Sequence, residues 1–267
     1  MHVLTQAPGG TSRIEVSSSS ERGQTLAASM LSPTFRKLLN VQETEPHILA
    51  LYMGPPGSGR SVLCKQYAYE LLQSGRKVIY ISTERSSADI VERMLGHGWE
   101  VKPYLRSSLR LVDMYSWLED GNQEYQETPF GSRLCPLNTT DLQMAIGKLY
   151  DELGSGWSIV ILDSLSTIIA MLGEERALRL IPTVAAKTRQ HGSAVVSLTS
   201  GIHAQSTLNQ LNSLFDLVVE MQIEAGEHLR RKLRITKYVL GKHQDGWIPF
   251  RILDQGITFG WDDTTET

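Results

Sequence analysis

Residues 54–61, GPPGSGRS, constrain the fold of this chain more than any other stretch. The phosphate-binding pattern G-x-x-x-x-G-K-[ST] is met at Gly54, Gly59 and Ser61, but Arg60 stands in the lysine position. Glycines let a backbone turn tightly and point its N–H groups at phosphate oxygens, and a helix that follows directs its positive end at the same anion. The stretch therefore predicts a nucleotide phosphate site. Its expected binding residues are Gly54, Pro55, Pro56, Gly57, Ser58, Gly59, Arg60, Ser61 and Val62.

The segments on either side of the loop favour this interpretation over a Gly/Pro turn that only imitates the motif. An apolar run at 47–53 predicts a strand before the loop. Leu63, Tyr67 and Leu71 are spaced by four residues and predict a helix after it. In such a strand–loop–helix unit, the hydroxyl of Ser61 would bind Mg²⁺.

The rest of the sequence alternates strand patterns with helical patterns. Alternating strands and helices form a mostly parallel sheet with helices on both faces, and consecutive strands at the end of a chain form an antiparallel edge. The predicted fold class is therefore α/β, with a twisted sheet and a C-terminal antiparallel β edge. The expected strands are 47–53, 77–83, 109–114, 157–163, 193–200, 214–223, 229–240 and 246–252, and the expected helices are 61–75, 86–98, 139–156 and 174–192, the last disturbed at Pro182.

Composition distinguishes the ends of the chain from its middle. Residues 1–30 are rich in Gly and Ser and predict a flexible N-terminal segment, whereas residues 31–260 are expected to form a single domain. Residues 261–267 are expected to form an acidic tail, and the composition of residues 119–138 predicts a loop. The net charge of −3 does not favour nucleic acid binding, which usually requires a basic domain.

The two cysteines, Cys64 and Cys135, belong to no Cys/His cluster, so we expect no zinc site. Two scattered cysteines are typical of a reducing cytosol. The sequence has no apolar run long enough for a transmembrane helix and no apolar region typical of a secretory signal. We expect a cytoplasmic protein, and peripheral attachment to a membrane complex stays open.

Two acidic residues follow strand patterns and are candidates for phosphate chemistry. Asp163 ends the apolar run IVILD and would hold magnesium together with Ser61, although such an acid can also cap a helix. Glu84 follows the run VIYIST and would orient or deprotonate an attacking water, or else be a solvated acid. Ser200 would sense the terminal phosphate, but an ordinary strand-end serine is about as good an interpretation.

These motifs together resemble the RecA-fold ATPases of the KaiC and RadA type, and in particular the archaellum accessory ATPase family FlaH (ArlH). The resemblance covers about residues 45–260. It rests on the stretches GSGRSVLCKQYAYELLQSGRKVIYISTE, IVILDSLS and LRITKYVLGKHQDGWIPFRILDQGITF. It implies one RecA-like domain over residues 31–260 that binds ATP with Mg²⁺ and assembles into a ring, with a hexamer expected.

The resemblance also implies partners and residue roles. FlaH proteins sit at the cytoplasmic base of the archaeal motility filament, against the motor ATPase and a membrane platform protein. By position, residues 54–62 form the phosphate loop, Asp163 is the magnesium acid and Glu84 is the catalytic acid. Lys237, in ITKY, matches a lysine that reaches the nucleotide of a neighbouring subunit in KaiC-like rings.

Three departures from the family pattern weaken hydrolysis more than binding. Arg60 replaces the loop lysine, Arg85 stands where a second glutamate is common, and Val239 stands where an arginine is common. Arginine keeps the positive charge, but it is planar and bulkier than lysine. A misplacement of about 1 Å costs on the order of 100-fold in rate. We therefore expect a regulatory subunit that binds ATP and hydrolyses it slowly or not at all.

Other functions remain open at this point. A KaiC-like signalling ATPase or kinase would favour a pair of glutamates and a duplicated domain, and the sequence has neither. A RadA-like recombinase would need a basic, aromatic groove for single-stranded DNA. The basic run at 228–237 alternates like a strand and also fits a solvated strand face. A nucleotide-free scaffold with an inactive loop is the fourth alternative.

Overall fold

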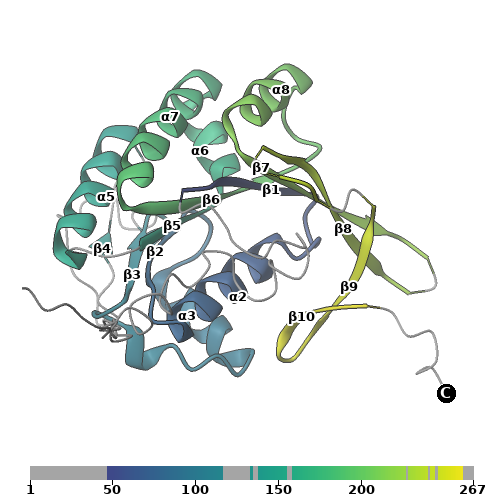
Figure 1. Cartoon of the computed structure of the whole chain (residues 1–267), viewed down its shortest axis with the longest axis horizontal. Helices are drawn as coiled ribbons and strands as arrows, with labels where there is room; N and C mark the ends of the chain where they lie inside the picture. Colours follow the sequence, from purple (N-terminus) through teal and green to yellow (C-terminus); the bar gives the residue numbers. More distant parts are fainter. Residues whose placement is uncertain are drawn as a thin grey trace, which may run out of the picture.

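The computed structural model describes residues 47–116, 133–134, 138–154, 158–226, 228–239, 241–243 and 246–260. The strands within these ranges join in one sheet (Figure 1). They are β1 (Leu49–Gly54), β2 (Lys77–Ser82), β3 (Leu109–Asp113), β4 (Arg133–Leu134), β5 (Ser158–Asp163), β6 (Gly192–Thr199), β7 (Leu217–Glu224), β8 (Arg230–Tyr238), β9 (Ile248–Leu253) and β10 (Gly256–Phe259). Their order across the sheet is β10-β9-β8-β7-β1-β6-β5-β2-β3-β4.

The sheet has a parallel part and an antiparallel end. From β7 to β4 all neighbouring strands run parallel, and β1 lies between β6 and β7. Strands β8, β9 and β10 continue from β7 in antiparallel pairs. The predicted fold class is therefore confirmed, and the carboxyl ends of β1, β2, β5 and β6 meet at one edge of the sheet.

Helices cover both faces of the sheet (Figure 1). Alternate residues along each strand point to opposite faces, so each buried strand contributes to two cores. One core packs under α2 and α3, and the other packs under α5, α6, α7 and α8. The helices are α2 (Arg60–Gln73), α3 (Ser87–Gly96), the short 3₁₀ helix η1 (Lys102–Tyr104), α5 (Thr139–Leu153), α6 (Leu165–Leu172), α7 (Glu174–His191) and α8 (Gln205–Leu214).

The antiparallel end curls over the face that carries α2 (Figure 1). Gln66 on α2 accepts a hydrogen bond from the backbone N–H of Ile257 at 2.7 Å and donates to its carbonyl at 3.3 Å. Trp99, after α3, donates its ring N–H to the carbonyl of Gln255 at 3.1 Å. These contacts attach the last hairpin, β9–β10, to the helix that begins in the phosphate loop.

The structure adds elements that the sequence patterns did not predict. Helices α6 and α8 and strands β4 and β10 were not expected, and α7 continues through Pro182 without a break. A proline inside a helix removes one backbone hydrogen bond. In α7 the buried face, which includes Leu180, Ile181 and Val184, packs on the sheet and outweighs that loss.

Several sequence-based expectations fall on residues outside the described ranges. These are the segment 1–30, the acidic tail 261–267, Cys135 and most of the loop 119–138, so they stay predictions, as do the domain bounds. Cys64 is a buried free cysteine. Among the described helices, none is both long enough and apolar enough to span a membrane.

Candidate functional site

The loop 54–59 connects the central strand β1 to α2 and depends on its glycines. Gly57 and Gly59 have φ angles of +80° and +97°, which residues other than glycine rarely adopt. A Cβ atom on Gly54 would lie 2.5 Å from Ser58 Oγ and 2.9 Å from Met221 Cβ. The loop borders a cavity of about 220 Å³ that Ile252 of β9 also lines. Residues of the loop and the first residues of α2 thus line one hollow at a helix N-terminus, which suits a phosphate.

Arg60 is the first residue of α2, and its guanidinium is only partly satisfied. The residue is 9% exposed, and Nη2 donates to Thr199 Oγ1 at 2.8 Å. Its Nε and Nη1 atoms are buried and have no hydrogen-bond partner within the described part of the chain. The buried Ser58 Oγ also lacks one there. Buried donors are almost always paired in folded proteins, so these groups indicate a ligand that accepts hydrogen bonds.

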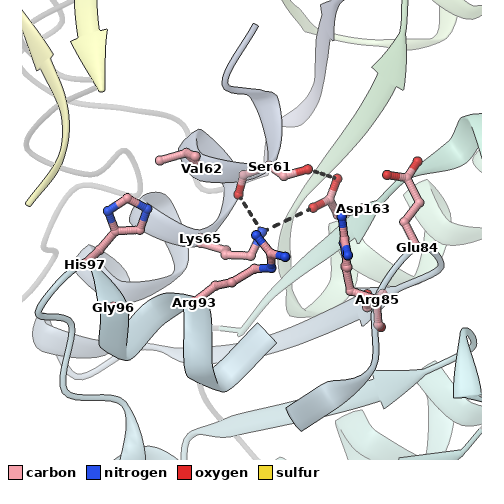
Figure 2. A pocket seen from close by; sticks show the side chains of 10 residues that line it. Ser61, Val62, Lys65, Glu84, Arg85, Arg93, Gly96, His97 and Asp163 are labelled. Carbon is pink, nitrogen blue, oxygen red and sulfur yellow. Dashed lines mark hydrogen bonds and ion pairs between the residues drawn. The ribbon is translucent and has the colours of Figure 1, made fainter. Parts of the chain in front are cut away.

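Asp163 ends β5 beside the start of α2 and accepts three hydroxyl hydrogen bonds. Its Oδ1 accepts from Ser61 Oγ at 3.1 Å and from Ser197 Oγ at 2.6 Å, and its Oδ2 accepts from Tyr80 OH at 2.8 Å. Burial, followed by the charge of Asp163, raises the pKa of Tyr80 well above its usual value, so this hydroxyl stays protonated and donates. Figure 2 shows Ser61 facing the Asp163 carboxylate.

The donor set of Ser61 and Asp163 fits magnesium. Mg²⁺ prefers oxygen ligands, keeps several waters and is usually bound through one or two carboxylates and the phosphates of a substrate. One hydroxyl and one carboxylate, 3.1 Å apart at the mouth of a phosphate loop, match that description. The described residues contain no cluster of three or more His, Cys, Asp or Glu side chains around a common metal position. Phosphate oxygens and waters would therefore complete the shell.

Lys65 lies one helical turn after Ser61 and reaches the same carboxylate. Its Nζ donates to the carbonyl oxygen of Ser61 at 3.1 Å and lies 3.9 Å from Asp163 Oδ2 (Figure 2). Both side chains are only 6% exposed. Burial lowers the pKa of Lys65, while the charge of Asp163 acts in the opposite direction. Lys65 was not predicted from the sequence, although its place between Cys64 and Tyr67 on the expected helix was a visible signal.

Glu84 lies just after β2, at the same edge of the sheet as Asp163. It is exposed, and its Oε1 accepts hydrogen bonds from Ser164 Oγ at 2.6 Å and from Thr167 Oγ1 at 3.4 Å. Both donors belong to the start of α6. The next residue, Arg85, pairs with Asp89 at 3.5 Å. The structure thus brings Glu84 to the site but ties its carboxylate to α6.

A second cavity of about 350 Å³ adjoins the loop and contains these groups. Figure 2 shows α2 and α3 on one side of it and the ends of β2 and β5 on the other. Arg93 of α3 lines it but is paired with Asp89 at 3.1 Å. The lining includes Ser61, Lys65, Glu84, Arg85, Arg93 and Asp163.

One candidate residue, Lys237, lies away from the phosphate loop of its own chain. Lys237 donates to the carbonyl oxygens of Asn212 and Ser213 at 2.8 and 3.4 Å, at the end of α8. In the sheet register it faces Val218, which pairs with Leu51 of β1 and not with the loop end of that strand. Within one chain, Lys237 is therefore not brought together with the phosphate loop.

Residues at the ends of β6 and β8 contact the loop, although little or nothing in the sequence indicated these contacts. Thr199 holds Arg60, whereas the neighbouring Ser200 donates its backbone N–H to the carbonyl of Gly54 at 2.9 Å. Arg231 of β8 donates from Nε to the carbonyl of Gly57 at 3.0 Å. The basic run at 228–237 was recognised in the sequence, but its contact with the loop required the antiparallel fold.

The fold and the site together define a P-loop nucleotide-binding protein with a RecA-like arrangement. A glycine-rich loop joins a central parallel strand to a helix, and an aspartate ends a nearby strand of the same sheet. The chain belongs to the KaiC family of ATPases, whose family model matches residues 46–264. This confirms the resemblance to KaiC-type RecA-fold ATPases.

Individual relatives are distant. A UPF0273 protein of Pyrococcus horikoshii is 28% identical over 80 residues, which cover 30% of this chain and 32% of that protein. The archaeal flagellar ATP-binding protein FlaH of Methanocaldococcus jannaschii is 28% identical over 81 residues, covering 30% of this chain and 35% of FlaH. The chain thus matches about a third of the length of these two curated relatives.

The fold also matches solved structures. The crystal structure of the flagellar accessory protein FlaH from Methanocaldococcus jannaschii superposes with a TM-score of 0.63 at 19% identity. The superposition covers 86% of this chain and 96% of that one. At this identity the likeness supports the shared fold alone.

Proposed function

We propose that this chain is an ATP-binding regulatory subunit of an archaeal motility motor, and that it hydrolyses ATP slowly or not at all. Membership of the KaiC ATPase family supports nucleotide binding. The partial similarity to the flagellar ATP-binding protein FlaH supports the link with motility. The motor ATPase and the membrane platform protein are the partners that this role requires.

The observation that carries the proposal is the state of Arg60. Its buried guanidinium has two unpaired N–H-bearing nitrogens at the loop, and an arginine binds phosphate with two parallel hydrogen bonds. A nucleotide phosphate in the loop would pair these atoms and Ser58 Oγ together. The loop amides and the start of α2 add further contacts that do not depend on residue 60.

The same arginine argues against fast hydrolysis. Nη2 is held by Thr199 at the end of β6, so the guanidinium is fixed toward that strand. A lysine would place a compact charge between the phosphates, and phosphoryl transfer depends on that placement. The carboxylate of the catalytic candidate Glu84 already accepts hydrogen bonds from the hydroxyl groups of Ser164 and Thr167. An attacking water would therefore compete with two hydroxyl groups for its carboxylate.

Magnesium would be held by Ser61 and Asp163, where it supplies positive charge to the transferring phosphate. The chain's own contribution at this point is orientation. Ser197 and Tyr80 fix the Asp163 carboxylate through two hydrogen bonds, and Tyr80 comes from the neighbouring strand β2. We further propose that the chain forms a ring, in which Lys237 would contact the nucleotide of the adjacent copy.

The test measures binding of fluorescent ATP and ADP with Mg²⁺, together with phosphate release, for the wild type and for Arg60→Lys. We expect tight binding by both proteins. We expect negligible turnover by the wild type and a gain of about 100-fold or more in Arg60→Lys, because the lysine restores the phosphate position. Fast turnover by the wild type would overturn the regulatory assignment. Absence of nucleotide binding in both proteins would overturn the nucleotide site itself.

The motility assignment needs a separate test. The tagged chain, expressed in its source organism, should co-purify with the motor ATPase of the motility filament when ATP and Mg²⁺ are present. The matched control is Arg60→Ala, which should weaken nucleotide binding and with it the association. If neither motor protein co-purifies with the wild type, the motility assignment is wrong. The chain would then be a nucleotide-binding protein of another pathway.

A further inference from the structure

Lys65 lies beside Asp163, the carboxylate that would hold magnesium. Packing of α2 does not require a lysine at this position. It lies on the buried face of α2, between Cys64 and the aromatic residue Tyr67, where apolar side chains dominate. Its Nζ is 3.1 Å from the Ser61 carbonyl oxygen, 3.9 Å from Asp163 Oδ2 and 6.0 Å from the centre of the Tyr80 ring. The ammonium group therefore lies within 4 Å of both residues that would hold magnesium.

A structural ion pair alone explains this arrangement poorly. The Asp163 carboxylate already accepts hydrogen bonds from Ser61, Ser197 and Tyr80, and these three hydroxyls satisfy it without the lysine. The distance of 3.9 Å is at the outer limit of an ion pair. Burying an ammonium group is costly unless it is paired and hydrogen-bonded. Lys65 makes one hydrogen bond, to the Ser61 carbonyl, and one distant ion pair, so some of its three N–H donors remain for a further acceptor. The charge of Lys65 is therefore better placed for something that approaches from the cavity.

The cavity next to Lys65 leads directly to the phosphate loop. Ser61 lines both the 350 Å³ cavity, which contains Lys65 and Asp163, and the 220 Å³ cavity of the loop. The other cations at the first cavity, Arg85 and Arg93, are engaged with Asp89. Lys65 is thus the buried cation nearest to the expected magnesium position among the described residues of this cavity.

We propose that Lys65 acts as a built-in cation that allows the loop to bind a nucleoside triphosphate without magnesium. The proposal rests on the nucleotide-binding function proposed above. Metal-free ATP carries more negative charge than its magnesium complex, and Asp163 would repel it. Lys65 offsets the Asp163 charge from within the protein, and Arg60 offers donors to the phosphates on the other side. Charges act strongly over such distances because the site is largely shielded from water.

The experiment measures the dissociation constant of a fluorescent ATP analogue by titration, once with excess Mg²⁺ and once with EDTA. The proteins are the wild type, Lys65→Met, Lys65→Arg and the control Lys102→Met. Methionine keeps the length and apolar stem of the side chain while removing its charge. Lys102 is an exposed lysine of η1 and lies outside both cavities. The thermal unfolding midpoint of each variant shows whether it is folded.

For the wild type and Lys102→Met, we expect EDTA to weaken binding by less than about threefold, which is below 1 kcal/mol. For Lys65→Met, we expect binding in Mg²⁺ to stay within about threefold of the wild type and binding in EDTA to weaken by at least about tenfold. Lys65→Arg should retain part of the metal-free binding, because it keeps the charge. This pattern is specific to a charge that substitutes for the metal and would not arise from a purely structural lysine.

The proposal would be overturned if the wild type bound nucleotide with Mg²⁺ and lost it in EDTA. It would equally fail if folded Lys65→Met kept the metal-free affinity of the wild type. In both cases the proposed nucleotide-binding function would survive. If the wild type bound no nucleotide under either condition, the proposed function would fail first. If Lys65→Met does not fold, Lys65→Gln, which also removes the charge, takes its place in the titration.

Discussion

Gly54 closes β1 directly before the phosphate loop and is packed on two sides. An added Cβ would be 2.5 Å from Ser58 Oγ and 2.9 Å from Met221 Cβ, the latter on the neighbouring strand β7. The backbone of β1 and β7 cannot separate without breaking their parallel pairing. At this residue, the spacing of the loop and the packing of the sheet thus require the same amino acid.

We expect Gly54→Ala to lower the free energy of unfolding by about 1–3 kcal/mol, the usual cost of an extra methyl in a packed site. Urea unfolding followed by circular dichroism measures the change. Gly96→Ala is the matched control, because a Cβ there meets no atom within 4 Å, and its effect should stay within about 0.5 kcal/mol. Equal effects of the two substitutions would contradict the steric argument.

Single residues of the site differ in how far the sequence predicted them. Ser61 and Asp163 were paired in advance, because a loop hydroxyl and a strand-end acid meet at the carboxyl edge of a parallel sheet, and their oxygens are 3.1 Å apart. Thr199 and Lys65 were not predicted. The contact of Thr199 depends on which way the long side chain of Arg60 turns, and nothing in the local pattern of β6 determines that. Lys65 had a signal in its place between Cys64 and Tyr67, but the pattern of α2 does not show that its ammonium group reaches Asp163. The roles of Glu84 and Lys237 stay predictions.

At the scale of elements, α6 is linked to the end of β6 and to the turn that precedes α8. Ser166 Oγ of α6 accepts the backbone N–H of Thr199 at 2.8 Å and lies 2.8 Å from His203 Nε2. The Ser166 hydroxyl can donate a hydrogen bond to Nε2 when this nitrogen carries no proton, as is the case in one tautomer of the neutral imidazole.

We therefore expect His203 to titrate below the ordinary histidine pKa of 6.5, since burial lowers its pKa. A folded-state pKa below the unfolded value favours the native state above the unfolded pKa. This contribution is lost as the pH falls from about 6.5 through the lowered folded pKa. Proton NMR of the imidazole resonances, with His203→Asn for assignment, measures the shift. Titration at or above 6.5 would contradict it.

Both of these helices escaped prediction for physical reasons. The eight residues of α6 are mostly apolar, and so short an apolar stretch directly after β5 does not distinguish a helix from a strand. Helix α8 is mostly polar and has no side-chain cap at Ala204, so its start lacks the usual signal. Helix α3, in contrast, was predicted at 86–98, because a serine stands at the start of its pattern. In the structure Ser86 caps the helix by accepting a hydrogen bond from the N–H of Asp89 at 3.2 Å.

For the whole molecule, the antiparallel end of the sheet connects distant parts of the chain around α2. The side chain of Gln66 is hydrogen-bonded to both the N–H and the carbonyl of Ile257. Ile252 of the same hairpin lies against Gly59 of the loop. The sequence predicted hairpin-linked strands at the C-terminus, but it did not predict that they fold back over the first helix. That arrangement depends on twist and on contacts between residues far apart in sequence.

We expect Gln66→Ala to loosen the last hairpin without unfolding the sheet. Losing a side chain that bonds a buried backbone group costs about 1 kcal/mol, so the Ile257 amide should exchange with solvent roughly fivefold faster or more. Hydrogen exchange followed by NMR measures this rate, and amides of β5 serve as the internal control. Unchanged exchange at Ile257 would show that other contacts hold β10 in place.

The position of β1 between β6 and β7 also determines when the phosphate loop can form during synthesis. The backbone N–H of Ile48 donates a hydrogen bond to Ser193 Oγ, 145 residues later in the chain. The N–H of Leu49 donates one to Asp216 Oδ2, 167 residues later. A ribosome that adds about 5–20 residues per second needs on the order of ten seconds to cover that distance. Throughout this interval the strand before the loop has no neighbours in the sheet. A growing chain therefore acquires its phosphate loop late, when β6 and then β7 have left the ribosome.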